Sequence, residues 1–251
     1  MDPNFLYQFT EPDPSIADFV ESIGFFHNRS DQPKEVVILP DGRIDLFFTQ
    51  FASGPYHAML MGLETLPEQR SIPPHMRTLV ISFKPLAVEY ILRMPIAGFL
   101  NSAQDLPSNF WNFSTDELDN FDRFSEKARE TVLQLLPQEI DSRKQQLFAL
   151  IYASKGEMTV KALSEKVAWS SRQINRYFNY QYGLSLKAYC NILRFRASLA
   201  HIAQGKLFPE LNFTDQTHFI KEIKKFSGVV PKELSKNQND RFVLLSILKQ
   251  S

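Results

Sequence analysis

Residues 159–183 read TVKALSEKVAWSSRQINRYFNYQYG, and their pattern indicates how the C-terminal half of the chain folds. Its apolar residues follow helical spacing on both sides of a short break: Leu163, Val167, Trp169, Ile174 and Phe178. Two short helices that cross around a tight turn bring such residues into contact. The stretch therefore predicts a helix-turn-helix, whose second helix begins at Ser170 or Ser171 and ends before Gly183.

The second helix of this stretch has one apolar and one polar face. The inward face is expected to hold Ile174, Tyr177, Phe178, Gln181 and Tyr182. The outward face carries side chains that hydrogen-bond to base edges, since Arg pairs with guanine and Asn or Gln with adenine. These candidate DNA-binding residues are Ser171, Arg172, Gln173, Asn175, Arg176 and Asn179. Residues 170–183 contain no Asp or Glu, whereas a generic surface helix usually mixes both signs of charge. The pattern therefore favours double-stranded DNA as partner.

Charge is distributed unevenly along the chain of 251 residues. Residues 1–140 contain 10 Lys and Arg against 20 Asp and Glu, while residues 141–251 contain 18 against 8. The formal net charge of zero thus averages an acidic half and a basic half. Such a division is typical of a polyanion-binding module joined to a domain of another kind.

The C-terminal half resembles the AraC/XylS-type DNA-binding domain over about 110 residues. The first block of matching residues is Leu163, Ser170, Ile174, Arg176, Phe178, Gly183, Leu184, Ser185 and 194–197. The second block is 213–219, followed by Lys224, Phe226, Gly228 and Pro231. The resemblance implies a bacterial transcription regulator in which two helix-turn-helix units, joined by a long helix, insert recognition helices into successive major-groove segments.

The sequence departs from the family pattern in the second unit. Residues 205–212 are several residues shorter than the usual first helix of that unit and include Pro209, so a full supporting helix cannot fit. In the first unit, Ser164 replaces the usual alanine, Ala168 the usual turn glycine and Leu186 a common proline. We therefore expect the second recognition helix to contact mainly phosphates. Its candidate residues are Thr214, Gln216, Lys221, Lys224 and Lys225.

The first 113 residues predict an α+β, β-rich domain, for which a barrel-like shape is one arrangement. The β-branched run at 36–39 ends at the turn signal Pro40-Asp41-Gly42, and 44–48 is expected as the returning strand. Residues 56–61 and 78–83 are further strand candidates, and the Pro-rich stretch between them predicts a long loop. A short helix is expected over 86–94, before Pro95.

This half also resembles, more weakly, the uncharacterised domain that precedes such DNA-binding modules in many regulators. The resemblance rests on 37–48, Met61-Gly62 and 81–85, and it implies a domain that senses a ligand or mediates association. A small-molecule effector and a homodimer are both compatible with it. The candidate ligand-binding residues are Asp41, Arg43 and Lys84; the alternative is that Asp41 and Arg43 only shape the turn.

The sequence divides into an N-terminal domain (1–113), a linker helix (114–137) and an all-α DNA-binding domain (138–251). Ser114 to Glu117 form a capping-box pattern that predicts the start of the linker helix, with the nearby acidic residues on a solvated face. These acidic residues are Asp116, Glu117, Asp119 and Asp122. Further helices are expected over 138–154, 159–167, 185–204, 214–226 and 242–248.

Composition narrows the functional classes. A single cysteine argues against a disulfide framework and fits a reducing compartment, so a cytoplasmic location is expected. No apolar run reaches the ~20 residues of a membrane span, and the first residues lack a secretory pattern. Neither a glycine-rich phosphate loop nor a catalytic motif is found, so we expect no enzyme activity, no metal and no cofactor. The alternatives are a protein-interaction module with a degenerate DNA-binding domain, or an enzymatic N-terminal domain.

Overall fold

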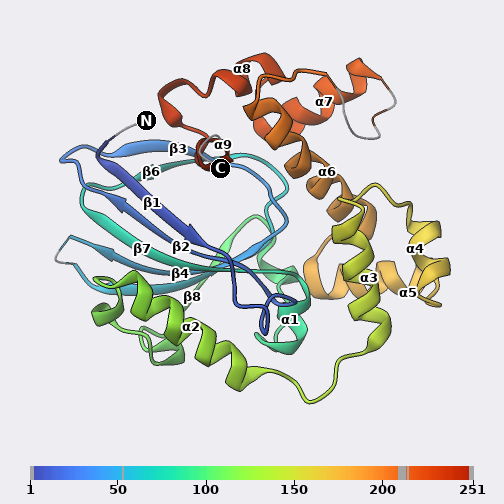
Figure 1. Cartoon of the computed structure of the whole chain (residues 1–251), viewed down its shortest axis with the longest axis horizontal. Helices are drawn as coiled ribbons and strands as arrows, with labels where there is room; N and C mark the ends of the chain where they lie inside the picture. Colours follow the sequence, from blue (N-terminus) through green and yellow to red (C-terminus); the bar gives the residue numbers. More distant parts are fainter. Residues whose placement is uncertain (1–2, 53, 209–212, 214, 249–251) are drawn as a thin grey trace.

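The structure is a computed structural model that describes residues 3–52, 54–208, 213 and 215–248. Strands dominate the first part of the chain and helices the remainder (Figure 1). The strands are β1 (Phe5–Thr10), β2 (Val20–Asn28), β3 (Lys34–Ile38), β4 (Ile44–Phe51), β5 (Tyr56–Met61), β6 (Glu68–Ile72), β7 (Met76–Phe83) and β8 (Ala103–Leu106). The α+β, β-rich N-terminal region and the helical C-terminal region agree with the fold class expected from the sequence.

The strands form one large and one small antiparallel sheet. The large sheet has the order β1-β2-β7-β4-β5-β8, and β3 pairs with β6 in a separate two-stranded sheet. Among the described residues β1 and β8 do not pair, so the large sheet stays open and the barrel-like arrangement is not found. On β4, Ile44, Leu46 and Phe48 are buried and alternate with half-buried residues, so one face of this strand covers the core.

Three local expectations in the N-terminal region were wrong. The strands β3 and β4 do not form a hairpin, because Pro40 to Gly42 carry the chain from the small sheet to the large one. The Pro-rich stretch contains strand β6, whose backbone pairs with β3 despite the flanking prolines. Helix α1 (Leu86–Tyr90) ends earlier than expected, since Arg93 already has a left-handed φ of 56°.

The segment expected as a linker helix is broken and packs on the sheet. The Ser114 capping box caps only a short 3-10 turn, η3 (Thr115–Glu117), and α2 (Phe121–Leu135) begins anew behind its own cap, Asn120. Phe124 of α2 is fully buried against Phe48 of the sheet. Glu117 is not solvated as expected: it is buried and accepts hydrogen bonds from Ser114 and from Lys127 at 2.8 Å. The other three acidic residues are exposed.

The C-terminal region is helical, as expected. Its helices are α3 (Ser142–Ala153), α4 (Val160–Lys166), α5 (Ser171–Tyr182), α6 (Leu186–Ala203), α7 (Gln216–Ser227), α8 (Pro231–Lys236) and α9 (Val243–Leu248). Helix α3 starts four residues later than expected, behind the cap Asp141, and α8 was not anticipated. Short 3-10 turns complete the chain: η1 (Ala97–Phe99), η2 (Phe110–Asn112) and η4 (Gln238–Asp240).

The two regions share one core. A continuous cluster of buried apolar side chains extends from Ile16 to Leu245 and includes strands and helices of both regions. The end of the chain returns to the small sheet, where the Val37 amide donates to the Arg241 carbonyl at 2.6 Å and α9 lies beside β3 (Figure 1). No described helix has the length and apolarity required to span a bilayer.

Candidate nucleic-acid interface

Helices α4 and α5 lie in the stretch for which the sequence predicts a helix-turn-helix, and they pack against each other. Leu163, Val167 and Ile174 are at most 2% exposed, so the two helices meet in a closed apolar contact. Thr159 caps α4, and Ser170 caps α5 through a reciprocal capping box with Gln173. Helix α5 ends at Gly183, whose left-handed φ of 74° suits a glycine C-cap.

The turn between the helices contains a strained residue. Ala168 has a φ of 51°, a left-handed conformation that an L-residue with a Cβ adopts at a cost. The next residue, Trp169, packs against Tyr177 of α5 with ring centroids 5.4 Å apart. Packing at Trp169 therefore holds the turn in a conformation that its own sequence does not favour.

The outward face of α5 is accessible. Arg172, Arg176 and Asn179 are exposed, on the side opposite to the buried Ile174, Phe178 and Tyr182. Within the described part of the chain neither arginine has a carboxylate partner. Their guanidinium groups are therefore available to an anion or to a base edge outside the protein.

Three other predicted residues of α5 have local partners. The Gln173 Oε1 atom accepts hydrogen bonds from the Ser170 hydroxyl at 2.7 Å and from its amide at 3.2 Å. The Asn175 Oδ1 atom accepts from the Leu186 amide at 3.2 Å, and its Nδ2 donates to the Ser171 carbonyl at 3.0 Å. In this conformation Gln173 and Asn175 therefore stabilise the start of α5 and its junction with α6, and Ser171 contributes a carbonyl.

The inner side of α5 is seated on the β-rich region. The Tyr177 hydroxyl donates to Glu89 at 3.0 Å, and Glu89 also binds the Lys144 ammonium of α3 at 2.6 Å. The buried Tyr182 hydroxyl donates to the Pro85 carbonyl at 3.1 Å. Helix α1 and the residue before it thus hold the inner side of α5, and the outward face of α5 remains exposed.

Helix α7 is the second candidate recognition helix. Its apolar residues Phe219, Ile223 and Phe226 are at most 2% exposed, and Asp215 caps its start through the His218 amide. The outward side chains Gln216, Lys221, Lys224 and Lys225 are all exposed. Thr214 lies outside the described residues. Because the exposed set is dominated by lysines, this face offers point charges more than hydrogen bonds of fixed direction.

The supporting helix of the second unit is not found in the part of the connection that the structure describes. Residues 204–208 form a turn and irregular backbone after α6. Helix α6 separates the two recognition helices: α5 lies near its start and α7 near its end (Figure 1). Its 18 residues span about 27 Å, comparable to the ~34 Å repeat of the DNA major groove.

Asp41 and Arg43 form a buried ion pair at the junction of the two regions. Next to it, Arg196 of α6 pairs with Glu21 of β2, and the Tyr189 hydroxyl donates to the Gly42 carbonyl at 3.0 Å. Burial alone would raise the pKa of Asp41, but the charges of Arg43 and Arg196 hold it below its ordinary value. These contacts fix the two regions relative to each other.

Two neighbouring carboxyl groups lack such compensation. Burial raises the pKa of Asp45 to about 6 despite the nearby Arg43 charge. Burial, together with the charges of Asp41 and Asp45, raises the pKa of Glu64 to about 8. One oxygen of each group is buried without a hydrogen-bond partner. Glu64 is therefore mostly protonated at neutral pH, whereas Asp45 takes up its proton only as the pH falls to about 6.

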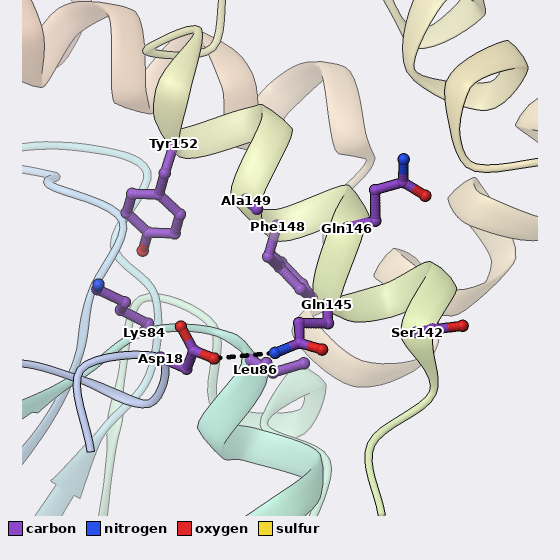
Figure 2. Close-up of a pocket in the computed structure, with 9 residues that line it drawn as sticks. All are labelled: Asp18, Lys84, Leu86, Ser142, Gln145, Gln146, Phe148, Ala149 and Tyr152. Carbon is purple, nitrogen blue, oxygen red and sulfur yellow. Dashed lines mark hydrogen bonds between the residues drawn. The ribbon is translucent and has the colours of Figure 1, made fainter. Parts of the chain in front are cut away.

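Lys84 lines a cavity of about 400 Å³ between the β-rich region and α3, whose lining does not include Asp41 or Arg43. Its ammonium donates to the Ala17 carbonyl at 2.6 Å and lies 5.3 Å from the centre of the Tyr152 ring. Figure 2 shows Gln145 of α3 joined to Asp18 across this cavity by a hydrogen bond of 3.1 Å. Of the three candidate ligand-binding residues, Asp41 and Arg43 are thus paired with each other, and Lys84 belongs to the lining of this cavity.

The described residues contain no group of three or more His, Cys, Asp or Glu that could hold a metal ion. Cys190 is buried on α6, and burial raises the pKa of its thiol to about 12. Sequence inspection did not single out Tyr180 of α5, which is 65% exposed. Its position four residues after Arg176 was the available signal.

Comparison with known proteins finds a family model for the β-rich half and solved structures that are similar to most of the chain. Residues 8–105 match the model of a domain of unknown function, DUF6597, which confirms the expectation of an uncharacterised domain in the β-rich half. A comparison with curated proteins found no match.

Solved structures of ToxT from Vibrio cholerae are similar to the chain along most of its length. An apo ToxT variant from strain SCE256 has 10% identity and a TM-score of 0.44, covering 94% of this chain and 98% of its own. ToxT from strain O395 has 11% identity and a TM-score of 0.43, covering 93% and 97%. An unsaturated fatty acid-bound ToxT from strain SCE256 has 10% identity and a TM-score of 0.39, covering 92% and 95%.

Proposed function

We propose that this protein is a sequence-specific, DNA-binding transcription regulator of the AraC/XylS type. The observation that carries the proposal is the exposed face of α5, where Arg172 and Arg176 have no carboxylate partner among the described residues and the opposite face is buried. A helix that is rigidly seated on one side and presents guanidinium groups on the other has the form of a recognition helix.

In this proposal α5 enters the major groove and reads bases. Arg172 lies in the first turn of α5, and Arg176 lies one turn later. The N-terminal residues of a recognition helix are the ones that contact base edges in the major groove. Each arginine can form two parallel hydrogen bonds with guanine, and Asn179 can bind adenine. Gln173 and Asn175 belong to the proposed surface as well. To contact bases, they must exchange local hydrogen bonds for bonds with DNA, and so must Asn179, whose Nδ2 donates to the Asn175 carbonyl at 2.8 Å.

The lysine-rich face of α7 contributes phosphate contacts in the same proposal. Lys221, Lys224 and Lys225 provide charge without the planar geometry that discriminates bases. Gln216, the first residue of α7, and Thr214, which lies outside the described residues, complete the proposed contact set. Each neutralised phosphate releases counterions, so the logarithm of the binding constant should fall with a slope of roughly −0.9 per contact as the logarithm of salt rises.

The β-rich half would control this module as a sensing or association domain. For sensing, the cavity beside Lys84 is the part of the structure that favours a small-molecule effector, because it lies between the two regions. Its wall on α3 carries Gln145, adjacent to Lys144, which holds Glu89 and through it Tyr177 of α5. A ligand in the cavity would therefore displace α3 and, through Lys144 and Glu89, alter the contact that holds Tyr177 of α5. Homodimer formation through this half is the second possible control.

The test is a binding measurement with the full-length protein at physiological salt. The protein should prefer a fragment from upstream of its own operon over random DNA of equal length. Arg172→Ala combined with Arg176→Ala should remove this preference, whereas Arg29→Ala, an exposed arginine of the β-rich region, should keep it. Equal binding of all fragments, or no binding, would favour the protein-interaction module instead.

A further inference from the structure

Tyr180 is an exposed aromatic residue on the recognition helix. Its side chain is 65% exposed, although the other aromatic residues of α5, Tyr177, Phe178 and Tyr182, are buried or half-buried. Within the described residues its side chain has no hydrogen bond and no ring contact. Nothing in the fold therefore explains why a tyrosine occupies this position.

The position of Tyr180 places it in line with the two exposed arginines. Arg172, Arg176 and Tyr180 are spaced at i, i+4 and i+8, so they follow one stripe along α5. Tyr180 lies about 12 Å along the helix axis from Arg172 and about 6 Å from Arg176. When the N-terminal part of the helix enters the major groove, Tyr180 therefore lies at the other end of the stripe, near the edge of the groove.

The surroundings of Tyr180 favour a polyanionic partner over an apolar protein surface. The other large apolar side chains that are exposed lie outside α5: Phe51, Leu66, Phe208 and Val230. Tyr180 thus shares its stripe with two cations and belongs to no apolar patch on this helix. A phenol suits the edge of a DNA groove, because its ring packs on a sugar while its hydroxyl donates to a phosphate oxygen.

We propose that Tyr180 is a DNA-contact residue, which donates a hydrogen bond to a backbone phosphate and packs its ring against the adjoining sugar. This inference rests on the proposed function and adds to it a contact that is neutral. Since a phenol displaces no counterion, its removal weakens binding without changing the salt dependence. Since phosphates and sugars are common to all sequences, its removal also leaves the base preference unchanged.

The experiment compares Tyr180→Ala, Tyr180→Phe and Lys225→Ala with the unaltered full-length protein on the preferred fragment and on random DNA. Tyr180→Ala should weaken binding to both by about five- to tenfold with an unchanged salt slope. Tyr180→Phe, which keeps the ring, should lose about two- to fivefold. Lys225→Ala should instead reduce the salt slope by about 0.9. Phe51→Ala, an exposed aromatic of the β-rich region, should bind as the unaltered protein does.

The outcomes separate this inference from the proposed function. If the unaltered protein prefers its fragment and Tyr180→Ala binds equally well, the Tyr180 contact is wrong and the regulator proposal stands. A change of base preference, or of oligomeric state measured by light scattering, would also overturn the contact. If the unaltered protein shows no preference for any DNA, both proposals fail together.

Discussion

The junction of the β-rich region and the outward faces of α5 and α7 place charged side chains in opposite environments. At the junction Asp41 and Arg43 are paired, with side chains only 12% and 14% exposed. On α5 and α7 the cations are exposed and, among the described residues, have no carboxylate partners. Arg43 and Arg176 are the same residue type. Arg43 pairs with the Asp41 carboxylate, whereas Arg176 has no carboxylate partner among the described residues.

This difference shows what each set of charges can do. A buried ion pair fixes the elements around it in one arrangement, because separating the partners would leave an uncompensated charge in the protein interior. An exposed cation adds little to folding and remains free for a partner. The paired charge at the junction therefore serves the structure, whereas in our proposal the exposed charge on α5 and α7 serves binding.

The largest effect is expected from Arg43→Ala. The substitution leaves Asp41 buried without its partner and should lower the free energy of unfolding by about 3–5 kcal/mol. Urea denaturation followed by circular dichroism measures the change, with Arg29→Ala as an exposed control. A loss below about 1 kcal/mol would show that the junction charge is dispensable for folding.

A pH series should show a second effect of buried charge. The pKa of Glu64 is raised to about 8 in the folded protein, above the ordinary value of 4.5, so the folded state holds the proton more tightly. Stability should therefore fall as pH rises from about 5 to 8, by on the order of 2–4 kcal/mol from this group. Glu64→Gln should remove this part of the decline in denaturation curves taken from pH 5 to 9. Parallel declines in both proteins would contradict the assignment.

A smaller effect is expected at the turn of the helix-turn-helix. Ala168→Gly relieves the left-handed strain but adds backbone entropy to the unfolded chain, for a net gain of about 0.5–1 kcal/mol. The matched control is Ala162→Gly in the interior of α4, which should lower stability by about 0.5–1 kcal/mol. Both are read from thermal unfolding. Two losses of equal size would mean that the turn is not strained.

The smallest change in the free energy of unfolding should come from replacing Arg172 or Arg176. Arg172→Ala and Arg176→Ala should each change the free energy of unfolding by less than about 0.5 kcal/mol, because neither side chain has a partner to lose. The same urea titration used for Arg43→Ala gives the comparison. A loss of about 2 kcal/mol or more would place these arginines among the structural charges.

Sequence patterns predicted the helical half better than the β-rich half. The helices around residues 159–183 have local signals, since Thr159, Ser170 and Gly183 cap them as expected. Strand pairing depends on distant partners: nothing near β3 indicates that it pairs with β6 across 30 residues. The burial of Glu117 likewise depends on Lys127, in the following helix.

The sequence predicted which residues belong to the candidate site and which of them face outward, but it did not predict their contacts with other helices. Helical spacing placed Arg172 and Arg176 outward, and the structure has them exposed. It could not show that Asn175 receives a hydrogen bond from Leu186, because that contact requires the angle between α5 and α6. Nor could it show that Asp41 pairs with Arg43 while Lys84 lines a cavity against α3, because the cavity depends on how α3 packs on the sheet.

The most direct test of the division between reading and positioning charges compares Arg176→Ala with Lys224→Ala. Binding of each full-length variant is measured on a panel of sites with single base-pair changes, at several salt concentrations. Arg176→Ala should cost about 1–3 kcal/mol on the preferred site and erase discrimination at one base pair. Lys224→Ala should weaken all sites alike and reduce the salt slope by about 0.9. If both variants shift every site equally, α5 does not read sequence and the central claim is wrong.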